Sequence, residues 1–472
     1  MDSNIKALLL QHKQEHLLEH LELLNETERR ELLDDIAEIN FLQVRQLYDS
    51  YRGSSKEQTA APAVESVKAL AFTEDETSRQ ERSRLHSLGE ELLRQGKVAC
   101  FLVAGGQGTR LGFDGPKGCY PISPIKNKSL FQLFAESVLA LQQLYGRPLP
   151  WYIMTSRENN GATCSFFEQH NFFGLPRDQV RFIIQQQIPS LDLNGRLIIS
   201  RDKKIFKNPN GHGGSLSALR ESGALDEMAR NGVEEIFYFQ VDNPLAKIAD
   251  PLFIGAHADR QADMSSKVVK KTDPNERVGI IGKIDGRLGC IEYSELTAEE
   301  AAETTADGGL RFGSANIAIH MLKRGFIEKL TSSAEFQLPY HIALKEIECL
   351  DITENQHRSA KIEGIKCELF IFDALGFAQQ SATLEIPRAE DFSPVKNSAG
   401  SDSPDTARRA MIDLHAGWLK TACAQETIPK NFTIEISPLC ALSPEEFTRK
   451  ATIPSPLPAS IYFDASGRQG HE

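Results

Sequence analysis

Cationic side chains gather around a glycine-rich segment in the first third of the chain. Three of the four residues Gly105–Gly108 are glycine, and Arg110 and Lys117 follow them. Glycine lets the backbone turn sharply and bring its N–H groups close to a ligand. A guanidinium and an ammonium add positive charge to the same loop. These residues favour a loop that binds phosphate, with Gly105 and Gly106 at its turn.

The segments on either side of this loop predict the elements that hold it. Val98–Val103 is an unbroken apolar run, short enough to be a strand buried on both faces. Leu130–Leu144 is amphipathic, and Ser129 and Gln132 have the spacing of a capping box at its start. The sequence therefore predicts a unit of buried strand, loop and helix.

Two commoner phosphate motifs do not fit this loop. Leu111 stands where the dinucleotide fingerprint needs its third glycine. Lys117 is followed by Gly118, whereas a Walker loop has Ser or Thr at that position. A glycine-rich turn can also be only a tight connection between two elements. Beside that interpretation there remains a nucleotide or sugar-phosphate loop of another type.

Composition limits the class of protein. The 472 residues carry a net charge of −12, from 53 Lys and Arg against 65 Asp and Glu. This length favours more than one domain, and the negative charge argues against a nucleic-acid surface. No apolar run approaches the ~18 residues of a membrane span. The eight cysteines are scattered without a CxxC pair, which favours reduced thiols. We expect a cytoplasmic protein that contacts neither nucleic acid nor membrane.

The first part of the chain is helical in pattern. Leucines recur among charged residues over Met1–Tyr51, with a new helix start at Asn25–Glu28. A second charged helix is expected at about Glu74–Gln95. The leucine-rich face could bind a partner helix, but packing against the main domain is the better interpretation. We expect an N-terminal helical region over residues 1–96.

From Val98 onward, predicted strands alternate with predicted helices. The next strands are expected at Trp151–Thr155, Val180–Ile184 and Ile236–Val241. This alternation predicts an α/β fold, with a Rossmann-like, open and mostly parallel sheet covered by helices on both faces. Ligands of such sheets bind beyond the carboxyl ends of the strands. The Gly105 loop and Asp242 both follow a strand, so we expect them to converge.

Asp242 has two interpretations. An aspartate at a strand end can simply cap the next turn. Beside a phosphate site, however, nucleotidyl transfer between polyanions calls for a hard cation with oxygen ligands. We therefore predict that Asp242 binds Mg²⁺.

The rest of the chain predicts a hairpin and a small C-terminal part. Asp285-Gly286 lies between apolar-rich segments, as in a hairpin turn. A helix is expected over Thr406–Leu419, and short strand-like runs follow it at Phe432–Ile436 and Ile461–Phe463. We expect a catalytic domain over residues 97–425 and a small C-terminal domain over residues 426–472.

Motifs from about residue 97 to residue 420 resemble those of nucleotide-sugar pyrophosphorylases. The run Leu102–Gly112 (LVAGGQGTRLG), followed by Pro116–Gly118 (PKG), carries the resemblance first. Further matching blocks are Trp151–Ser156, Phe172–Leu175, Asn210–Gly214, Val241–Asn243, Ile291–Glu295, Ala315–Ala318, Phe370–Asp373 and Asp391–Asn397. Within the UDP-sugar pyrophosphorylase family, the pattern is most similar to eukaryotic-type UDP-N-acetylglucosamine pyrophosphorylases. This resemblance implies a nucleotidyltransferase fold of the glycosyltransferase-A-like type.

The resemblance also implies roles for residues on the substrates' organic groups. Gln185 resembles the family's uracil-recognising glutamine, Gly211 the glycine at the base, and His212 the residue near the hexose. The positions that hold the sugar hydroxyls are matched by Gly279, Glu292 and Asn316. Phe370 and Phe372 alternate as in a strand and are interpreted as core.

The implied reaction is uridylyl transfer from UTP to a hexose 1-phosphate, with Mg²⁺ as cofactor. Arg110 and Lys117 are assigned to the triphosphate, Lys396 to the α-phosphate and Asp242 to the metal. The nucleophile is already anionic, so catalysis is expected to rest on charge neutralisation and positioning. A monomer or a weak homo-oligomer is expected.

The sugar stays open at this point. N-acetylglucosamine-type members generally have Asn where His212 stands, whereas glucose-type members have Gly-His-Gly in this loop. N-acetylglucosamine 1-phosphate is the first choice, and a glucose-type or broad-specificity enzyme is the alternative. A non-catalytic UTP-binding regulator would lack the three cations, and a dehydrogenase would need the dinucleotide fingerprint.

Overall fold

The computed structural model describes residues 3–54, 63–333, 336–353, 356–423, 428–429 and 431–470. Its contacts divide the chain into two compact units, each built from separate stretches of sequence. The hairpin unit comprises Met1–Pro62, Gln185–Gly214 and Gln337–Ile371, and the sheet unit comprises Ala63–Ile184, Ser215–Phe336 and Phe372–Glu472. The predicted boundaries at residues 97 and 426 stay predictions, and residue 426 lies outside the described residues.

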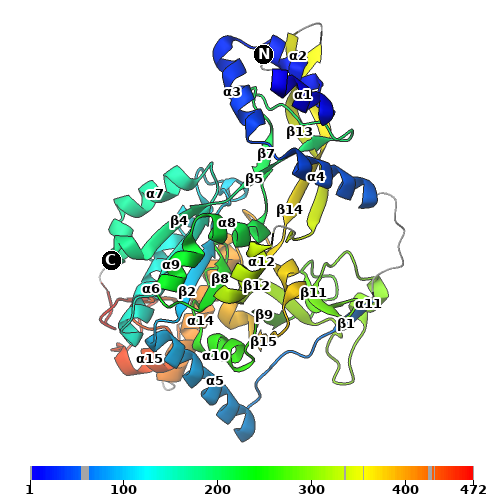
Figure 1. The fold of residues 1–472 in the computed structure, drawn as a ribbon. Coiled ribbons are helices and arrows are strands. Elements are labelled where there is room, and N and C mark those ends of the chain that lie inside the picture. Colours follow the sequence, from blue (N-terminus) through cyan, green and yellow to red (C-terminus); the bar gives the residue numbers. More distant parts are fainter. Residues whose placement is uncertain are drawn as a thin grey trace. The chain divides into compact units, whose positions relative to one another are not determined.

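The sheet unit is organised around a sheet of ten strands (Figure 1). Its centre is parallel: β2 (Val98–Val103) lies between β8 (Glu235–Gln240) and β3 (Trp151–Thr155), and β4 (Val180–Ile184) pairs with β3. The first five residues of β2 are buried, as its apolar run predicts. The predicted parallel core of an α/β fold is therefore confirmed.

Antiparallel strands extend this core on the side of β8. β12 (Ser314–Lys323) pairs with β8, and β9 (Met264–Lys270) pairs with β12 and runs parallel to β15 (Thr383–Ile386). β10 (Ile280–Ile284) lies between β12 and the short β1 (Val64–Ser66).

The predicted hairpin is confirmed at the edge of these strands. β10 pairs with β11 (Arg287–Ile291), and Ile284 lies opposite Arg287. Asp285 and Gly286 both have positive φ, the backbone conformation that a two-residue hairpin turn of this type requires.

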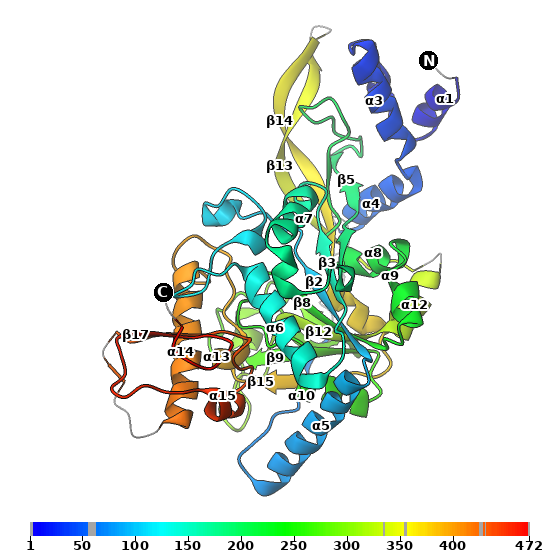
Figure 2. The same cartoon turned by 90° about the vertical axis from the view of Figure 1, so that its left-hand side faces the viewer.

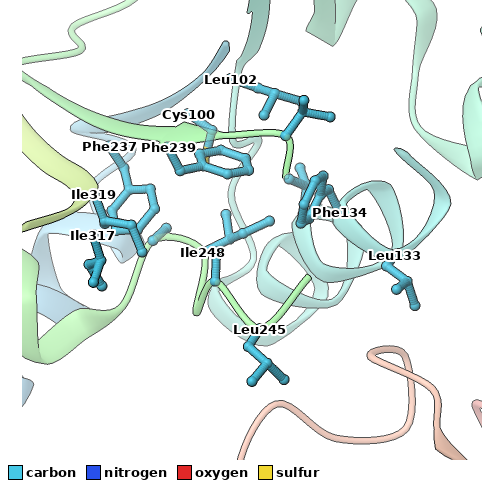
Figure 3. Close-up of a cluster of buried hydrophobic side chains, with 14 of the residues drawn as sticks. Cys100, Leu102, Leu133, Phe134, Phe237, Phe239, Leu245, Ile248, Ile317 and Ile319 are labelled. Atoms are coloured by element: carbon cyan, nitrogen blue, oxygen red, sulfur yellow. The ribbon is translucent and has the colours of Figure 1, made fainter. Parts of the chain in front are cut away.

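Helices cover both faces of the sheet, as Figures 1 and 2 show. On one face, Phe239 of β8 packs edge-on against Phe134 of α6 (Leu130–Tyr145). The apolar cluster around these rings, with side chains from β2, β8, β12 and α6, is drawn in Figure 3. On the other face, the Tyr152 hydroxyl of β3 donates to Glu227 of α9 (Ala224–Arg230) at 3.0 Å. The alternating side chains of a parallel strand are thus buried on both sides.

Further helices of the sheet unit agree with the sequence pattern. Ser129 caps α6 by accepting the Gln132 N–H at 3.1 Å, as its spacing predicts. Other helices of the unit are α5 (Glu76–Arg94), α7 (Asn160–Gln169), α8 (Ser215–Glu221), α10 (Pro251–Asp259), α11 (Ala298–Ala302), α12 (Arg324–Ser332), α13 (Arg388–Asp391), α14 (Pro404–Ala422) and α15 (Pro444–Lys450). The strand-like runs near the end form β16 (Thr433–Ile436) and β17 (Ser460–Phe463), which pair in parallel.

In the part of the hairpin unit that the structure describes, four α-helices pack with a long hairpin. The helices are α1 (Ser3–Gln11), α2 (His16–Glu22), α3 (Glu26–Ala37) and α4 (Phe41–Ser54). The strands of the hairpin are β13 (Tyr340–Thr353) and β14 (Gln356–Leu369), and the shorter strands are β5 (Gln187–Pro189), β6 (Leu191–Asp192) and β7 (Lys207–Pro209). Helix α3 starts with a capping box from Asn25 and Glu28, as predicted. The helix leucines form one core with residues such as Ile188, Leu197 and Ile365 of the same unit.

The strand-like interpretation of Phe370 and Phe372 is wrong. Strand β14 ends at Leu369, and a 3₁₀ segment occupies Ile371–Phe377. The Ile371 N–H turns away from any ladder and donates to Nδ1 of His212 at 3.1 Å. A side-chain acceptor from a distant part of the sequence therefore replaces the strand partner that the alternation suggested.

None of the helices in the described parts of the chain is both long and apolar enough to span a bilayer.

Close contact between α5 and α10 predicts a large stability effect at one glycine. A Cβ on Gly255 of α10 would lie 1.8 Å from the backbone oxygen of Leu85 in α5. Gly255→Ala should lower the free energy of unfolding by about 1–3 kcal/mol, because the two helices must separate. Gly417 of α14 has nothing within 4 Å of such a Cβ, so Gly417→Ala should raise it by roughly 0.5–1 kcal/mol. Urea denaturation compares the two variants, and equal shifts would contradict this packing.

A buried histidine predicts that the hairpin unit loses stability in mild acid. Nδ1 of His20 lies 3.0 Å from Nε2 of His357. Burial, together with His357 and His16, lowers the pKa of His20 from 6.5 to about 4. The folded state thus keeps this imidazole neutral where the unfolded chain protonates it. Its contribution is complete above the unfolded pKa of 6.5 and is lost as the pH falls towards 4.

The matching experiment measures urea midpoints between about pH 7 and about pH 5. His20→Leu should flatten the fall in stability on acidification, because it removes the titrating group. His86→Leu in α5 is the control, and its profile should follow that of the unmodified protein. An equally steep profile for His20→Leu would exclude His20 as the source.

Candidate functional site

The glycine loop lies where two neighbouring parallel strands end. Val103 of β2 lies opposite Gln240 of β8, and the Val241 N–H donates to the Val103 oxygen at 3.0 Å. The loop after β2 and Asp242 after β8 therefore begin side by side in the sheet unit. This is the convergence that the alternating pattern predicts.

Backbone hydrogen bonds fold the loop back on itself. The Lys117 N–H donates to the Gly106 oxygen at 3.1 Å, and the Gly108 N–H donates to the Gly115 oxygen at 2.8 Å. Gly105 is half-buried and Gly106 is exposed, with nothing within 4 Å of a Cβ placed on it. The turn is thus tied to Lys117 while its outer side stays open to solvent.

Asn159 holds the loop through two hydrogen bonds to its backbone. Sequence reasoning missed this residue. Its fully buried side chain donates to the oxygens of Ala104 at 2.9 Å and Gly106 at 3.3 Å. It follows β3 much as Asp242 follows β8, and that strand-end position is the signal that could have revealed it.

The predicted charged residues lie within electrostatic reach of one another. The Lys117 ammonium donates to the Val395 oxygen at 3.4 Å, next to Lys396. Burial lowers the pKa of Lys117, Asp242 opposes that shift, and Arg110 and Lys396 add to it. Arg110 and Lys396 are exposed, and Asp242 is half-buried. Three cations and one carboxylate therefore gather beside the glycine loop.

The donor set around Asp242 suits one kind of metal site. Among the described residues, no group of three or more His, Cys, Asp or Glu side chains could hold a metal ion. Magnesium needs no such cage, because it commonly takes one or two carboxylates and completes its shell with water and substrate phosphates. A single Asp242 carboxylate beside a phosphate loop fits that mode of binding.

The three residues predicted for the sugar hydroxyls come together at the β10–β12 edge. The Asn316 N–H donates to the Gly279 oxygen at 2.8 Å. A Cβ on Gly279 would lie 2.5 Å from Sγ of Cys290 and 3.7 Å from Oε1 of Glu292. The Asn316 side-chain amide donates to that sulfur at 3.7 Å. Cys290 was missed, although it stands two residues before Glu292 and so shares its side of an extended chain.

Gln185 and Gly211 meet in the hairpin unit. The Gln185 side-chain nitrogen donates to the Gly211 oxygen at 2.6 Å and to Oδ1 of Asn210 at 3.2 Å. Gly211 has φ +81°, and a Cβ on it would lie 2.4 Å from the Leu369 oxygen. Only glycine allows this loop to close so tightly around the end of β14.

His212 is held as a neutral ring in the same loop. Its ring stacks on Phe370 with centroids 5.2 Å apart and planes inclined by 12°, and Phe370 stacks in turn on His341. Burial, with His341 nearby, lowers the pKa of His212 to about 4. Because Nδ1 accepts the Ile371 N–H, the ring hydrogen lies on Nε2. Phe370, which the sequence placed in the core, is thus a half-buried support for His212.

The predicted site residues therefore fall into three groups. Beside the loop of the sheet unit lie Gly105, Gly106, Arg110, Lys117, Asp242 and Lys396. At the β10–β12 edge of that unit lie Gly279, Glu292 and Asn316. The hairpin unit holds Gln185, Gly211 and His212.

Comparison with known proteins gives consistent matches over nearly the whole chain. The family model described as UTP–glucose-1-phosphate uridylyltransferase matches residues 43–455. UDP-N-acetylhexosamine pyrophosphorylase-like protein 1 of Homo sapiens is 36% identical over 441 residues, covering 90% of this chain and 86% of that protein. UDP-N-acetylglucosamine pyrophosphorylase of Saccharomyces cerevisiae is 34% identical over 439 residues, covering 89% and 92%.

A solved structure agrees with these matches. The crystal structure of the uridine diphosphate N-acetylglucosamine pyrophosphorylase from Trypanosoma brucei superposes with a TM-score of 0.82 at 28% identity, covering 96% of each chain. The family match, the relatives and the fold all agree with the motifs, so this chain belongs to the UDP-sugar pyrophosphorylase family of nucleotidyltransferases.

Proposed function

We propose that this protein transfers the uridylyl group of UTP to N-acetylglucosamine 1-phosphate. The observation that carries the proposal is the gathering of Arg110, Lys396 and Asp242 around Lys117 in a protein whose net charge is −12. A polyanionic substrate needs such a local concentration of cations. The names of the yeast relative and of the trypanosomal structure support N-acetylglucosamine 1-phosphate as the sugar substrate.

The proposed reaction is an in-line displacement at phosphorus. A phosphate oxygen of the sugar phosphate forms a bond to the α-phosphorus of UTP. The bond from that phosphorus to the bridging oxygen of the β-phosphate breaks, and its electron pair leaves with pyrophosphate. The nucleophile is already an anion, so no side chain has to remove a proton. Lys117, Arg110 and Lys396 neutralise charge that builds on the phosphate oxygens.

Asp242 is the residue that would hold Mg²⁺ in this scheme. Bound together with substrate phosphates, the ion would supply further neutralisation of their charge. The glycine loop contributes its backbone N–H groups, which can approach a phosphate closely because no side chain shields Gly106.

The remaining site residues offer hydrogen-bonding groups for the base and the sugar. The Gln185 amide nitrogen already donates to Asn210 and Gly211, so its oxygen is the atom suited to accept a hydrogen bond from a base. Glu292 and Asn316 offer a carboxylate and an amide for sugar hydroxyls. His212 stands where glucose-type members have the His of Gly-His-Gly, and this keeps glucose 1-phosphate as the second candidate.

We propose that the protein works in the cytoplasm. All eight cysteines are free thiols, which suits the reducing cytoplasm. We also propose that the protein works as a monomer or a weak homo-oligomer.

Replacing Lys117 should slow turnover strongly without unfolding the protein. Lys117→Ala should lower kcat by roughly 10²–10³-fold, because one preorganised charge is lost from the transition state. Lys97→Ala is a matched control. Lys97 lies just before β2, at the end of that strand away from the Lys117 loop, and pairs with Glu234 at 2.6 Å. Pyrophosphate release reports kcat, and circular dichroism reports folding. Near-normal turnover of Lys117→Ala would remove Lys117 from the mechanism.

Substrate choice is tested by pyrophosphate release from UTP with three sugar phosphates in parallel. We expect the fastest release with N-acetylglucosamine 1-phosphate, and lower rates with glucose 1-phosphate and galactose 1-phosphate. Chelation of Mg²⁺ by EDTA should stop the reaction. A preference for glucose 1-phosphate would favour the second candidate, and inactivity with all three would contradict the proposed function.

A further inference from the structure

A fully buried lysine lies beneath the turn that follows β8. Lys267 of β9 has no exposed surface, and its ammonium lies 2.9 Å from Oδ2 of Asp250 and contacts Oδ2 of Asp391. Asp250 also lies 3.5 Å from the ammonium of Lys247. Two buried carboxylates thus share one buried ammonium in the interior of the sheet unit, and the exposed Lys247 adds a second ammonium on the solvent side of Asp250.

Stability alone is a weak reason for such a group of charges. Desolvation of buried ions largely cancels their attraction, and apolar side chains of similar size often stabilise a core equally well. A buried ion pair does, however, define one arrangement of the segments that carry its members. The segments that Lys267 joins therefore matter more than its contribution to stability.

One of these segments carries Lys396. Asp391 ends α13, and its Oδ1 accepts the Lys247 N–H at 2.7 Å in the turn after β8. The Asn243 side-chain nitrogen donates to the backbone oxygen of Asp391 at 2.7 Å, and its side-chain oxygen accepts the Ser393 N–H at 3.1 Å. Residues 391–393 are thereby fixed against the turn that begins at Asp242.

The contacts continue to the charged group of the site. The Val395 N–H donates to the backbone oxygen of Asp242 at 2.7 Å, and the backbone oxygen of Val395 accepts from the Lys117 ammonium at 3.4 Å. Lys396 follows directly, and its N–H donates to the Asp402 oxygen at 2.7 Å. Hydrogen bonds and the short backbone segment 391–396 thus connect the buried Lys267 with Lys117, Asp242 and Lys396.

We propose that Asp391, held by Lys267, is a positioning residue that sets Lys396 against Asp242 for the transfer step. This inference rests on the proposed uridylyltransferase function. Asp391 has no proposed contact with substrate and acts only through the segment 391–396. Asp250 pairs with the same lysine but caps α10 by accepting the Leu252 N–H at 3.2 Å, and it lies outside that segment.

The test compares Asp391→Asn with Asp250→Asn. Both changes keep the side-chain shape, remove one carboxylate from Lys267 and alter the charge equally, and Asn still caps α10 in the second variant. Thermal unfolding should show similar losses of stability. Asp391→Asn alone should lower kcat by roughly ten- to hundredfold with little change in KM for UTP, because a displaced Lys396 weakens transition-state contacts.

Two further measurements separate positioning from general damage. In a Lys396→Ala background, Asp391→Asn should cause no additional loss of kcat, because its effect passes through Lys396. Hydrogen exchange of residues 392–397 should become faster in Asp391→Asn and stay slow in Asp250→Asn. Should Asp391→Asn fail to fold, Asn243→Ala removes both side-chain hydrogen bonds to this segment, and the same kcat loss and faster exchange are expected.

The proposal is overturned if the two Asn variants lose kcat equally, or if Asp391→Asn lowers kcat as much without Lys396 as with it. It is also overturned if exchange of residues 392–397 is unchanged. An unmodified protein that releases no pyrophosphate with any of the three sugar phosphates would instead refute the proposed function, and hydrogen exchange still tests the positioning contact in that case.

Discussion

The parallel pairing of β2 with β8 is the interaction on which the rest of the sheet unit depends. Its register sets Val103 level with Gln240, so the two chains leave the sheet at the same height. The glycine loop therefore lies next to Asp242, although the two are far apart in the sequence. Val395 then adds to this edge by donating to the Asp242 oxygen, which brings Lys396 to the same place. Without that strand pairing, nothing would bring the three cations and the carboxylate to the same edge of the sheet.

The sequence predicted the parts of the structure that follow from local pattern. The apolar run of β2, the Ser129 cap of α6 and the Asp285-Gly286 turn each depend on neighbouring residues, and each is confirmed. The meeting of the Gly105 loop with Asp242 was also predictable, because parallel topology carries strand ends to one edge. Resemblance to a family supplied the roles of Gln185, Glu292 and Lys396, which no local pattern indicates.

The parts that sequence reasoning missed depend on contacts between distant segments. Lys267, in a strand, has no sequence signal that pairs it with Asp391, and no local pattern connects Asn243 with the segment after Asp391. The β13–β14 hairpin, which shares a core with the N-terminal helices, was not foreseen because its charged residues hide the alternation. Phe370 was misinterpreted for a related reason: its stacking on His212 and His341 depends on a loop far away in the chain.

The charged group beside the loop also explains how an acidic protein can bind polyanions. Burial and the neighbouring Arg110 and Lys396 lower the pKa of Lys117, so the cations repel one another in the protein alone. Asp242, the strongest charge effect on Lys117, opposes this repulsion. Phosphate groups would relieve it, and each relieved repulsion adds to their binding. Repulsion also means that the cations stay in place only if the backbone holds them, as the bonds of Lys117 to Gly106 and Val395 do. Affinity for phosphate and rigidity of the loop are therefore two results of one arrangement.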